Sequence, residues 1–138
     1  MDSKKIAISG IAAGFVFYIL YMILAIIITA IPGLAYDPAT LDGMRPMDSV
    51  LMSLFMLFPF VISFTMAIAY EQLKPAFSKD FVRNGIQYGF MIWIVAGIPS
   101  IFIVFTSMSY PLGFNLTQII GYAVSYIGAG IVTAKLME

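Results

Sequence analysis

The side chains that could do chemistry are few, and every charged one lies outside the long apolar runs of the chain. The carboxylates that could serve as acids or bases are Asp37, Asp42, Asp48, Glu71 and Asp80. The absence of Cys and His excludes disulfides, thiol redox chemistry, His-ligated zinc and Ser-His-Asp triads. Catalysis needs positioned partners, and no spacing pairs these carboxylates. The sequence therefore predicts a protein that is not an enzyme and needs no cofactor.

Three of these carboxylates fall in one predicted loop, and carboxylate oxygens are ligands for hard cations such as calcium. The spacing of Asp37, Asp42 and Asp48 lacks the glycine and glutamate of an EF-hand. Asp37-Pro38 and Asp42-Gly43 are common turn signals, so turn formation explains these residues better than a metal site. A formal net charge of zero gives no electrostatic basis for binding nucleic acid.

The composition defines the elements that must carry any site. Of the 138 residues, 62% are hydrophobic and 10% charged, whereas soluble domains average ~45–50% apolar and ~25% charged residues. Four charge-free runs predict helices at about 6–31, 49–70, 84–107 and 112–134. Each can cross a ~30 Å hydrocarbon core, in which only helices and closed barrels satisfy their backbone. We expect one all-α domain, 1–138: an integral membrane bundle of four transmembrane helices.

The basic residues predict how the chain threads. If the N-terminus is cytoplasmic, the outer side carries only Arg45. The inner side then carries Lys4, Lys5, Lys74, Lys79, Arg83 and Lys135. Cytoplasmic loops are enriched in Lys and Arg. The sequence therefore predicts a multi-pass protein of the cell membrane with both termini cytoplasmic, in contact with the lipid bilayer.

Small residues at helical spacing predict close helix packing. They are Gly10 and Gly14, Gly85 and Gly89, and the stripe Gly121, Ser125, Ala129 and Thr133 with Gly128 beside it. Small residues let two helix backbones approach closely in lipid. We favour packing among the chain's own four helices, and a seam between subunits of a homo-oligomer or with other membrane subunits is the alternative. The first and third helices both open with G-I-x-x-G-F, which suggests two parallel two-helix halves.

Two prolines interrupt the apolar runs at similar predicted depth. Pro59 and Pro99 each free a backbone carbonyl four residues earlier, which predicts a kink. A static kink that shapes the bundle is the favoured interpretation, and a hinge or broken-helix binding site is the alternative.

Polar side chains near the outer helix ends form a candidate vestibule. The residues with this position are Ser53, Thr106, Asn115 and Gln118. Helix capping and interfacial hydration are the simpler explanation for them. A second candidate group, Trp93 with Gln87 and Tyr88, lies deeper in the third helix. A buried indole needs a partner for its N–H. Bundle packing explains this group better than contact with a lipid or a quinone-like ligand.

The segment from Gly85 to Ser100, with its G-x-x-x-G start and later Gly97-Ile98-Pro99-Ser100, resembles the third helix of a loose group of proteins. These are small, uncharacterised four-helix membrane proteins of prokaryotes. The Gly-rich stretch from Gly121 to Gly130 is compatible with their fourth helix. The resemblance covers about a third of the chain and implies the four-helix fold but no activity.

No Asp, Glu, Lys, Arg or His lies inside any apolar run, although pumps and carriers of charged substrates normally need one at membrane depth. We therefore expect a non-catalytic structural or accessory subunit of a homo-oligomer or larger membrane complex. The alternative is a small channel or carrier for a neutral or apolar solute.

Overall fold

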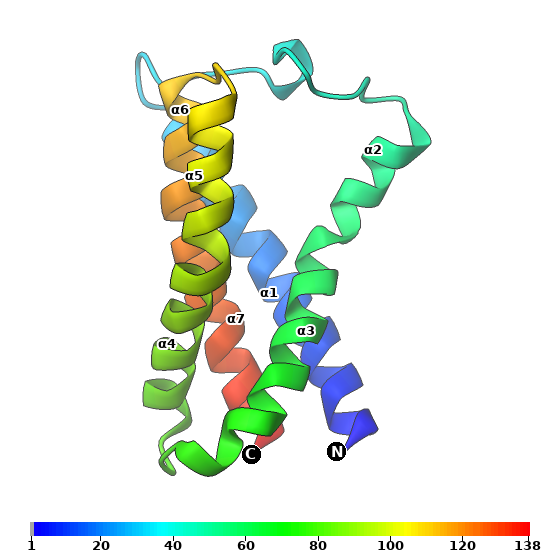
Figure 1. The fold of residues 1–138 in the computed structure, drawn as a ribbon, viewed down its shortest axis with the longest axis vertical. Coiled ribbons are helices and arrows are strands. Elements are labelled where there is room, and N and C mark those ends of the chain that lie inside the picture. Colours follow the sequence, from blue (N-terminus) through cyan, green and yellow to red (C-terminus); the bar gives the residue numbers. More distant parts are fainter. Residues whose placement is uncertain (1) are drawn as a thin grey trace.

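The computed structural model, which describes residues 2–138, is all-helical in that part of the chain (Figure 1). Four helices are long and apolar enough to cross a membrane: Ser3–Thr29, Val50–Ala76, Phe81–Ser107 and Leu112–Met137. We call them the first to fourth long helices. The prediction of an all-α fold with four such helices is confirmed. Both chain ends lie at one end of the bundle, the terminal end, and the connection 30–49 crosses the other, the loop end (Figure 1).

Only the first long helix is regular throughout, as α1 (Ser3–Thr29). The second consists of α2 (Val50–Leu54), the 3-10 turn η2 (Phe55–Leu57), α3 (Phe58–Leu73) and η3 (Lys74–Ala76). The third consists of α4 (Phe81–Ile92), the π-helical turn η4 (Trp93–Gly97) and α5 (Ile98–Ser107). The fourth consists of α6 (Leu112–Leu116), the π-helical turn η5 (Thr117–Gly121) and α7 (Tyr122–Met137). A short 3-10 turn, η1 (Pro38–Thr40), lies in the long connection.

The first and third helices start earlier than the apolar runs because polar residues cap them. The Asp2 carboxylate accepts hydrogen bonds from the backbone N–H of Lys4 and Lys5, so the first helix starts at Ser3 rather than at 6. Asp80 caps α4 in the same way, so the third helix starts at Phe81 rather than at 84. The second and fourth helices continue through charged residues, to Ala76 and Met137, because a charge at a helix end does not stop the helix.

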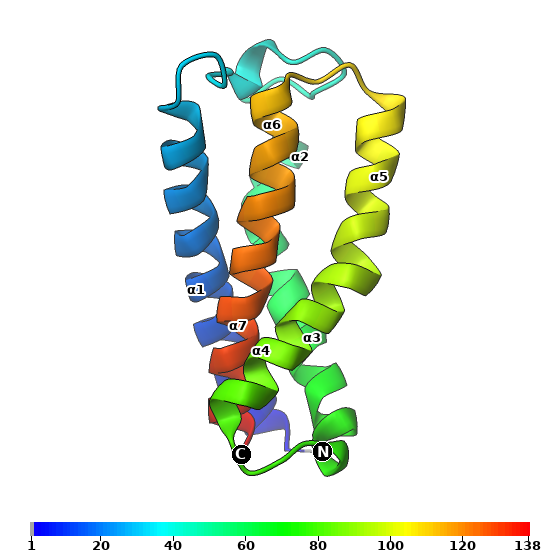
Figure 2. The same ribbon diagram turned by 90° about the vertical axis from the view of Figure 1, so that its left-hand side faces the viewer.

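The fourth long helix is the centre of the bundle. Its α7 segment packs against α1, α3 and α4, and α1 also packs against α3 (Figure 2). The side chains buried among these four segments lie in the half nearer the terminal end, and they include Ala13, Phe17, Met66, Ala67, Tyr70, Tyr88, Tyr126, Ala129, Ala134 and Met137. That half is therefore closed.

Glycines set the closest crossing, between α4 and α7. A Cβ on Gly85 would lie 2.7 Å from the backbone nitrogen of Ile131, and one on Gly89 would lie 2.6 Å from Cα of Ile127. The Gly130 position is equally tight against the backbone of Gly85. Because the obstacles are backbone atoms, no side-chain rotation could make room for a larger residue.

The glycines of the first helix meet side chains instead. A Cβ on Gly10 or Gly14 would lie 2.6 Å from the ring of Phe64 or Phe60 of α3. Both G-I-x-x-G-F motifs thus face the long helix that follows them in the chain. Phenylalanine rings fill the contact between α1 and α3, whereas the two helix backbones meet directly between α4 and α7.

The small-residue stripe of the fourth helix points into its own chain. Gly121, Ser125, Ala129 and Thr133 are buried, and Gly128 is half-buried beside Leu20. The buried Ser125 and Thr133 hydroxyls make no hydrogen bond within residues 2–138. These two side chains therefore allow close helix packing through their small size and not through hydrogen bonding. This placement agrees with packing among the chain's own helices.

Lysines close the terminal end. Lys5 Nζ donates a hydrogen bond of 2.7 Å to the backbone carbonyl of Glu138. Lys74 Nζ donates to the carbonyls of Met137 and Glu138. Cations are favourable at a helix C-terminus, where free carbonyls concentrate negative charge. The first and second helices are thereby attached to the end of the fourth.

A buried tyrosine connects the third and second helices. The Tyr88 hydroxyl donates a hydrogen bond of 2.6 Å to the backbone carbonyl of Met66, and its ring packs against Tyr70. We expect Tyr88→Phe to destabilise the protein by about 1 kcal/mol, because the buried carbonyl loses its side-chain donor. Unfolding in mixed detergent–SDS micelles measures the loss. The same change at half-buried Tyr110, whose hydroxyl makes no hydrogen bond among residues 2–138, should have no effect, and an equal loss there would contradict this role.

The loop end is open, in contrast. None of the residues Val50 to Leu57, which we call the arm, is buried. The arm diverges from α5 and α6 in the direction of the loop end, and the connection 30–49 crosses above the gap (Figure 1). α5 diverges from α6 as well (Figure 2). The bundle is therefore closed in one half and separated in the other.

Candidate functional site

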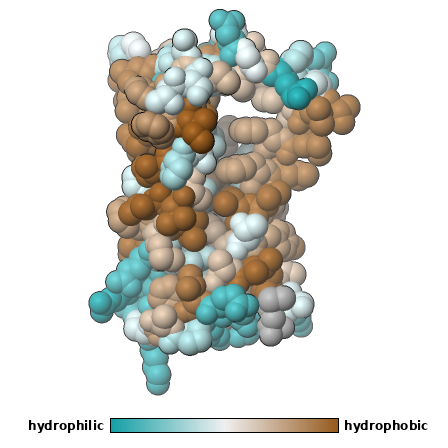
Figure 3. Space-filling model, viewed as in Figure 1, coloured by the Kyte–Doolittle hydropathy of each residue, from teal (hydrophilic) through white to brown (hydrophobic). Residues whose placement is uncertain are grey.

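The separation of the helices leaves a cavity of about 250 Å³, which we call the main cavity. It lies among the second, third and fourth long helices. Its walls are Phe58, Ile62, Ala96, Gly97, Ser100, Ile101, Val104, Asn115, Gln118, Tyr122 and Tyr126. The space-filling view shows a hollow between the arm and the α5–α6 column, with apolar residues on both sides (Figure 3).

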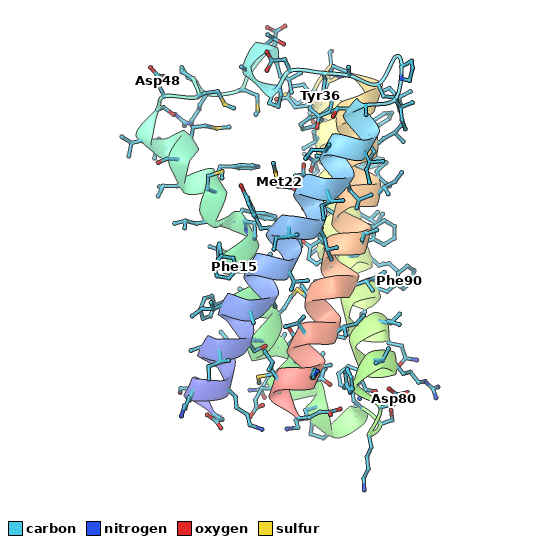
Figure 4. The ribbon with its side chains drawn as sticks, turned by 180° about the vertical axis from the view of Figure 1, so that it is seen from behind. Phe15, Met22, Tyr36, Asp48, Asp80 and Phe90 are labelled. Atoms are coloured by element: carbon cyan, nitrogen blue, oxygen red, sulfur yellow. The ribbon has the colours of Figure 1, made fainter. Side chains whose placement is uncertain are left out.

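A second cavity, of about 160 Å³, lies between the first and second helices. Phe17, Tyr21, Met22 and Pro59 are among its lining residues, and Met22 extends from α1 into the gap facing the arm (Figure 4). Phe58 and Tyr122 line both cavities. Their rings, 5.8 Å apart, therefore form the partition between the two spaces.

Asn115 is the most informative polar group of the main cavity. Its side chain is only 6% exposed. Its amide nitrogen donates to the backbone carbonyls of Tyr110 and Pro111, at 3.1 and 3.2 Å. Because carbonyl oxygens accept only from the NH₂ group, these bonds fix which end of the amide is which. The amide oxygen accepts no hydrogen bond from residues 2–138, although the residue lines the cavity.

Gln118, one turn deeper, has a similar arrangement. Its Nε2 lies 2.9 Å from the hydroxyl of Tyr21, which links the first and fourth helices. In either orientation of this amide, one of its ends stays free to bond elsewhere. Ser100 is different, since its hydroxyl donates to the carbonyl of Ala96 in its own helix. The unused hydrogen-bonding capacity of the cavity is therefore concentrated on the fourth helix.

Both π-helical turns border the main cavity. η4 contributes Ala96 and Gly97, and η5 contributes Gln118. A π-turn is less favourable than regular helix and occurs frequently at functional sites. η4 directly precedes the helix that contains Pro99, and η2 precedes Pro59. The predicted kink positions are thus the positions at which helix geometry changes.

The predicted vestibule is only partly assembled. Asn115 and Gln118 lie in the main cavity, whereas exposed Ser53 and Thr106 do not line it. The hydroxyl of Ser53 donates to Val50 O, and that of Thr106 donates to carbonyls one turn back in its own helix. These two residues satisfy local backbone instead of forming a site.

The group around Trp93 does not converge either. Tyr88 is buried, whereas Gln87 is exposed on another face of the same helix. The indole of Trp93 contacts the Gly97 position, and its buried N–H has no acceptor among residues 2–138. Trp93 therefore lies just behind the cavity wall rather than in a site with Gln87 and Tyr88.

The carboxylates stay apart. Asp48 and Asp80 lie at opposite ends of the molecule (Figure 4). Within residues 2–138 no three acidic, His or Cys side chains form a group that could hold a metal ion.

Sequence reasoning missed Gly113 and the bonding roles of Lys5 and Lys74. A Cβ on Gly113 would lie 2.8 Å from the backbone of Leu34, so this glycine lets the long connection pack on α6. The available signal was its position as the second residue of a predicted helix, two residues after Pro111. The lysines predict only the orientation of the chain, because nothing in the sequence places them beside residue 138.

Comparison with protein-family models, curated proteins and solved structures found no match. The fold and site define the class directly: a four-helix bundle of membrane-spanning length, closed in one half, with an amphipathic cavity in the other.

Proposed function

We propose that this protein is a non-catalytic multi-pass membrane protein that assembles laterally with another membrane subunit through its arm. In this proposal it lies in the cell membrane with both termini cytoplasmic, which places the loop end and the main cavity on the outer side. The excess of Lys and Arg near the terminal end supports that orientation.

The observation that carries the proposal is the isolation of the arm. Residues 50–57 have no buried member, although the helix continues into the well-packed α3. Without a hydrophobic drive between helices, membrane bundles are held by close packing and hydrogen bonds. Among residues 2–138, the one side-chain hydrogen bond that the arm donates runs from Ser53 to Val50 O inside the arm, and no arm residue is buried against another helix. A neighbouring helix seated on the arm would supply the missing packing.

Crosslinking from the arm tests this assembly. The chain has no Cys, so Leu54→Cys creates a single thiol to which a benzophenone maleimide can be attached in native membranes. We expect irradiation to give one crosslinked protein adduct of defined mass, either a dimer or a complex with a second subunit. The adduct is measured by immunoblotting and mass spectrometry.

The matched control is Ile26→Cys, on the first helix close to the same end and also exposed. It should give at least about five times less protein adduct, because no assembly surface is assigned there. Equal yields from both thiols, or lipid adducts alone, would contradict the proposal.

A second candidate function is a carrier for a neutral solute, which the polar groups Asn115 and Gln118 favour. The closed half would then have to open, since Phe17, Met66 and Tyr126 block the path to the terminal end. Solute flux into proteoliposomes addresses this alternative.

A further inference from the structure

We infer that the main cavity binds a neutral lipid with a hydroxyl-bearing head and a single hydrocarbon chain, its hydroxyl donating to the Asn115 amide oxygen. The inference goes beyond the assembly proposal and does not depend on it. It also names the class of ligand that a carrier would move. The flux assay tests transport and the binding assay tests the cavity, so transport can be absent although the lipid binds.

The first argument is the unsatisfied acceptor. Asn115 is only 6% exposed and lines the cavity, and its NH₂ group is engaged by two carbonyls, which leaves its amide oxygen without a donor among residues 2–138. A molecule in the cavity can bond this free acceptor, and such a hydrogen bond contributes about 0.5–1.5 kcal/mol. That molecule must present an O–H or N–H. An ester or ether oxygen cannot.

The second argument is the length of the cavity. Along the fourth helix its lining runs from Asn115 near the loop end to Tyr126, roughly 16 Å at about 1.5 Å per residue. That is about half of a ~30 Å hydrocarbon core, the thickness of one leaflet. A lipid of the leaflet at the loop end would thus have its head beside Asn115 and its tail at the centre of the bundle.

The third argument is the distribution of polarity. The two amides lie at the loop end of the cavity, and Phe58, Ile62, Ile101 and Val104 supply apolar walls. No Lys, Arg, Asp or Glu lines the space. A charged head group would lose its hydration without gaining a counter-ion, which is costly. Ser100, Tyr122 and Tyr126 also line the space, and the Ser100 hydroxyl is bonded to its own helix. The walls therefore fit a neutral amphipathic molecule.

The single Trp93 provides the measurement, since its ring contacts Gly97 at the deep end of the cavity. The protein is placed in phosphatidylcholine nanodiscs. A monoacylglycerol with a dibrominated stearoyl chain is then added, and the bromines quench the indole. The methyl ester of the same brominated acid, which lacks a hydroxyl, is the matched probe. We expect saturable quenching by the monoacylglycerol, with at least about threefold higher affinity than for the ester.

Two variants separate binding in the cavity from adhesion elsewhere. Asn115→Leu should weaken monoacylglycerol binding about three- to tenfold, as expected for one hydrogen bond. Ala96→Leu fills the cavity wall without touching a polar group and should abolish saturation. Val95→Leu is its control, because Val95 is 68% exposed and does not line the cavity. Equal quenching by the two probes, or saturation that survives Ala96→Leu, would overturn the inference.

Discussion

Replacing Gly89 by Ala should destabilise the protein by at least about 2 kcal/mol, although alanine is the better helix former by ~1 kcal/mol. The added methyl group would meet the backbone of Tyr126 and Ile127, at distances that real Cβ atoms do not show. Backbone cannot rotate away, so α4 and α7 must separate and lose the closest crossing of the bundle. Unfolding in mixed detergent–SDS micelles, followed by circular dichroism, measures the effect.

Gly121→Ala is the matched control, because it introduces the same methyl group into the fourth helix. Its nearest neighbours are ring carbons of Tyr21, at 3.2 and 3.3 Å, which a small side-chain movement accommodates. Helix propensity should then dominate, and the free energy of unfolding should stay constant or rise slightly. If both substitutions had the same effect, the backbone crossing would not be the reason for glycine at 89.

Removing the Phe17 side chain should cost about 2–4 kcal/mol, the second large effect that we expect. Phe17 is 1% exposed and touches rings from two other long helices: Phe58, Tyr122 and Tyr126, with centroids 5.1–6.0 Å away. Phe17→Ala would leave a void where the first, second and fourth helices meet. Aromatic pairs add to the packing energy that is lost.

Phe102→Ala tests whether position or residue type matters. Phe102 is 65% exposed on α5, so detergent replaces its contacts after truncation. We expect the free energy of unfolding of the Phe102→Ala variant to be lower than that of the unchanged protein by less than about 0.5 kcal/mol. A loss as large as that of Phe17→Ala would mean that the phenylalanines act through general hydrophobicity instead of the central cluster.

The helices could be predicted from the sequence because their signal is strong and local. Charge-free runs of this length leave no other element. Two helices start earlier because Asp2 and Asp80 cap them, and the second and fourth continue past their runs to Ala76 and Met137. The two G-I-x-x-G-F motifs show where local reasoning stops. They are identical in type, yet Phe60 and Phe64 face one pair of glycines and a helix backbone faces the other. Their partners come from distant sequence.

The main cavity could not be predicted for a related reason. Phe58 and Ile62 in its wall are the same residue types as those in the closed half, so composition does not reveal where helices separate. The sequence does place Asn115 and Gln118 in a candidate polar vestibule. The donors and acceptors that they use, Tyr110, Pro111 and Tyr21, depend on a turn and on a helix far away in the chain.

The two π-helical turns also affect how this chain aligns with others. A π-turn accommodates one residue more than the α-helix around it, while the flanking segments keep their faces. A homologue without the extra residue in 93–97 or 117–121 would differ by a single-position gap inside an otherwise matching helix. Such a gap would mark the loss of a local widening beside the main cavity, and the four-helix architecture would be unchanged.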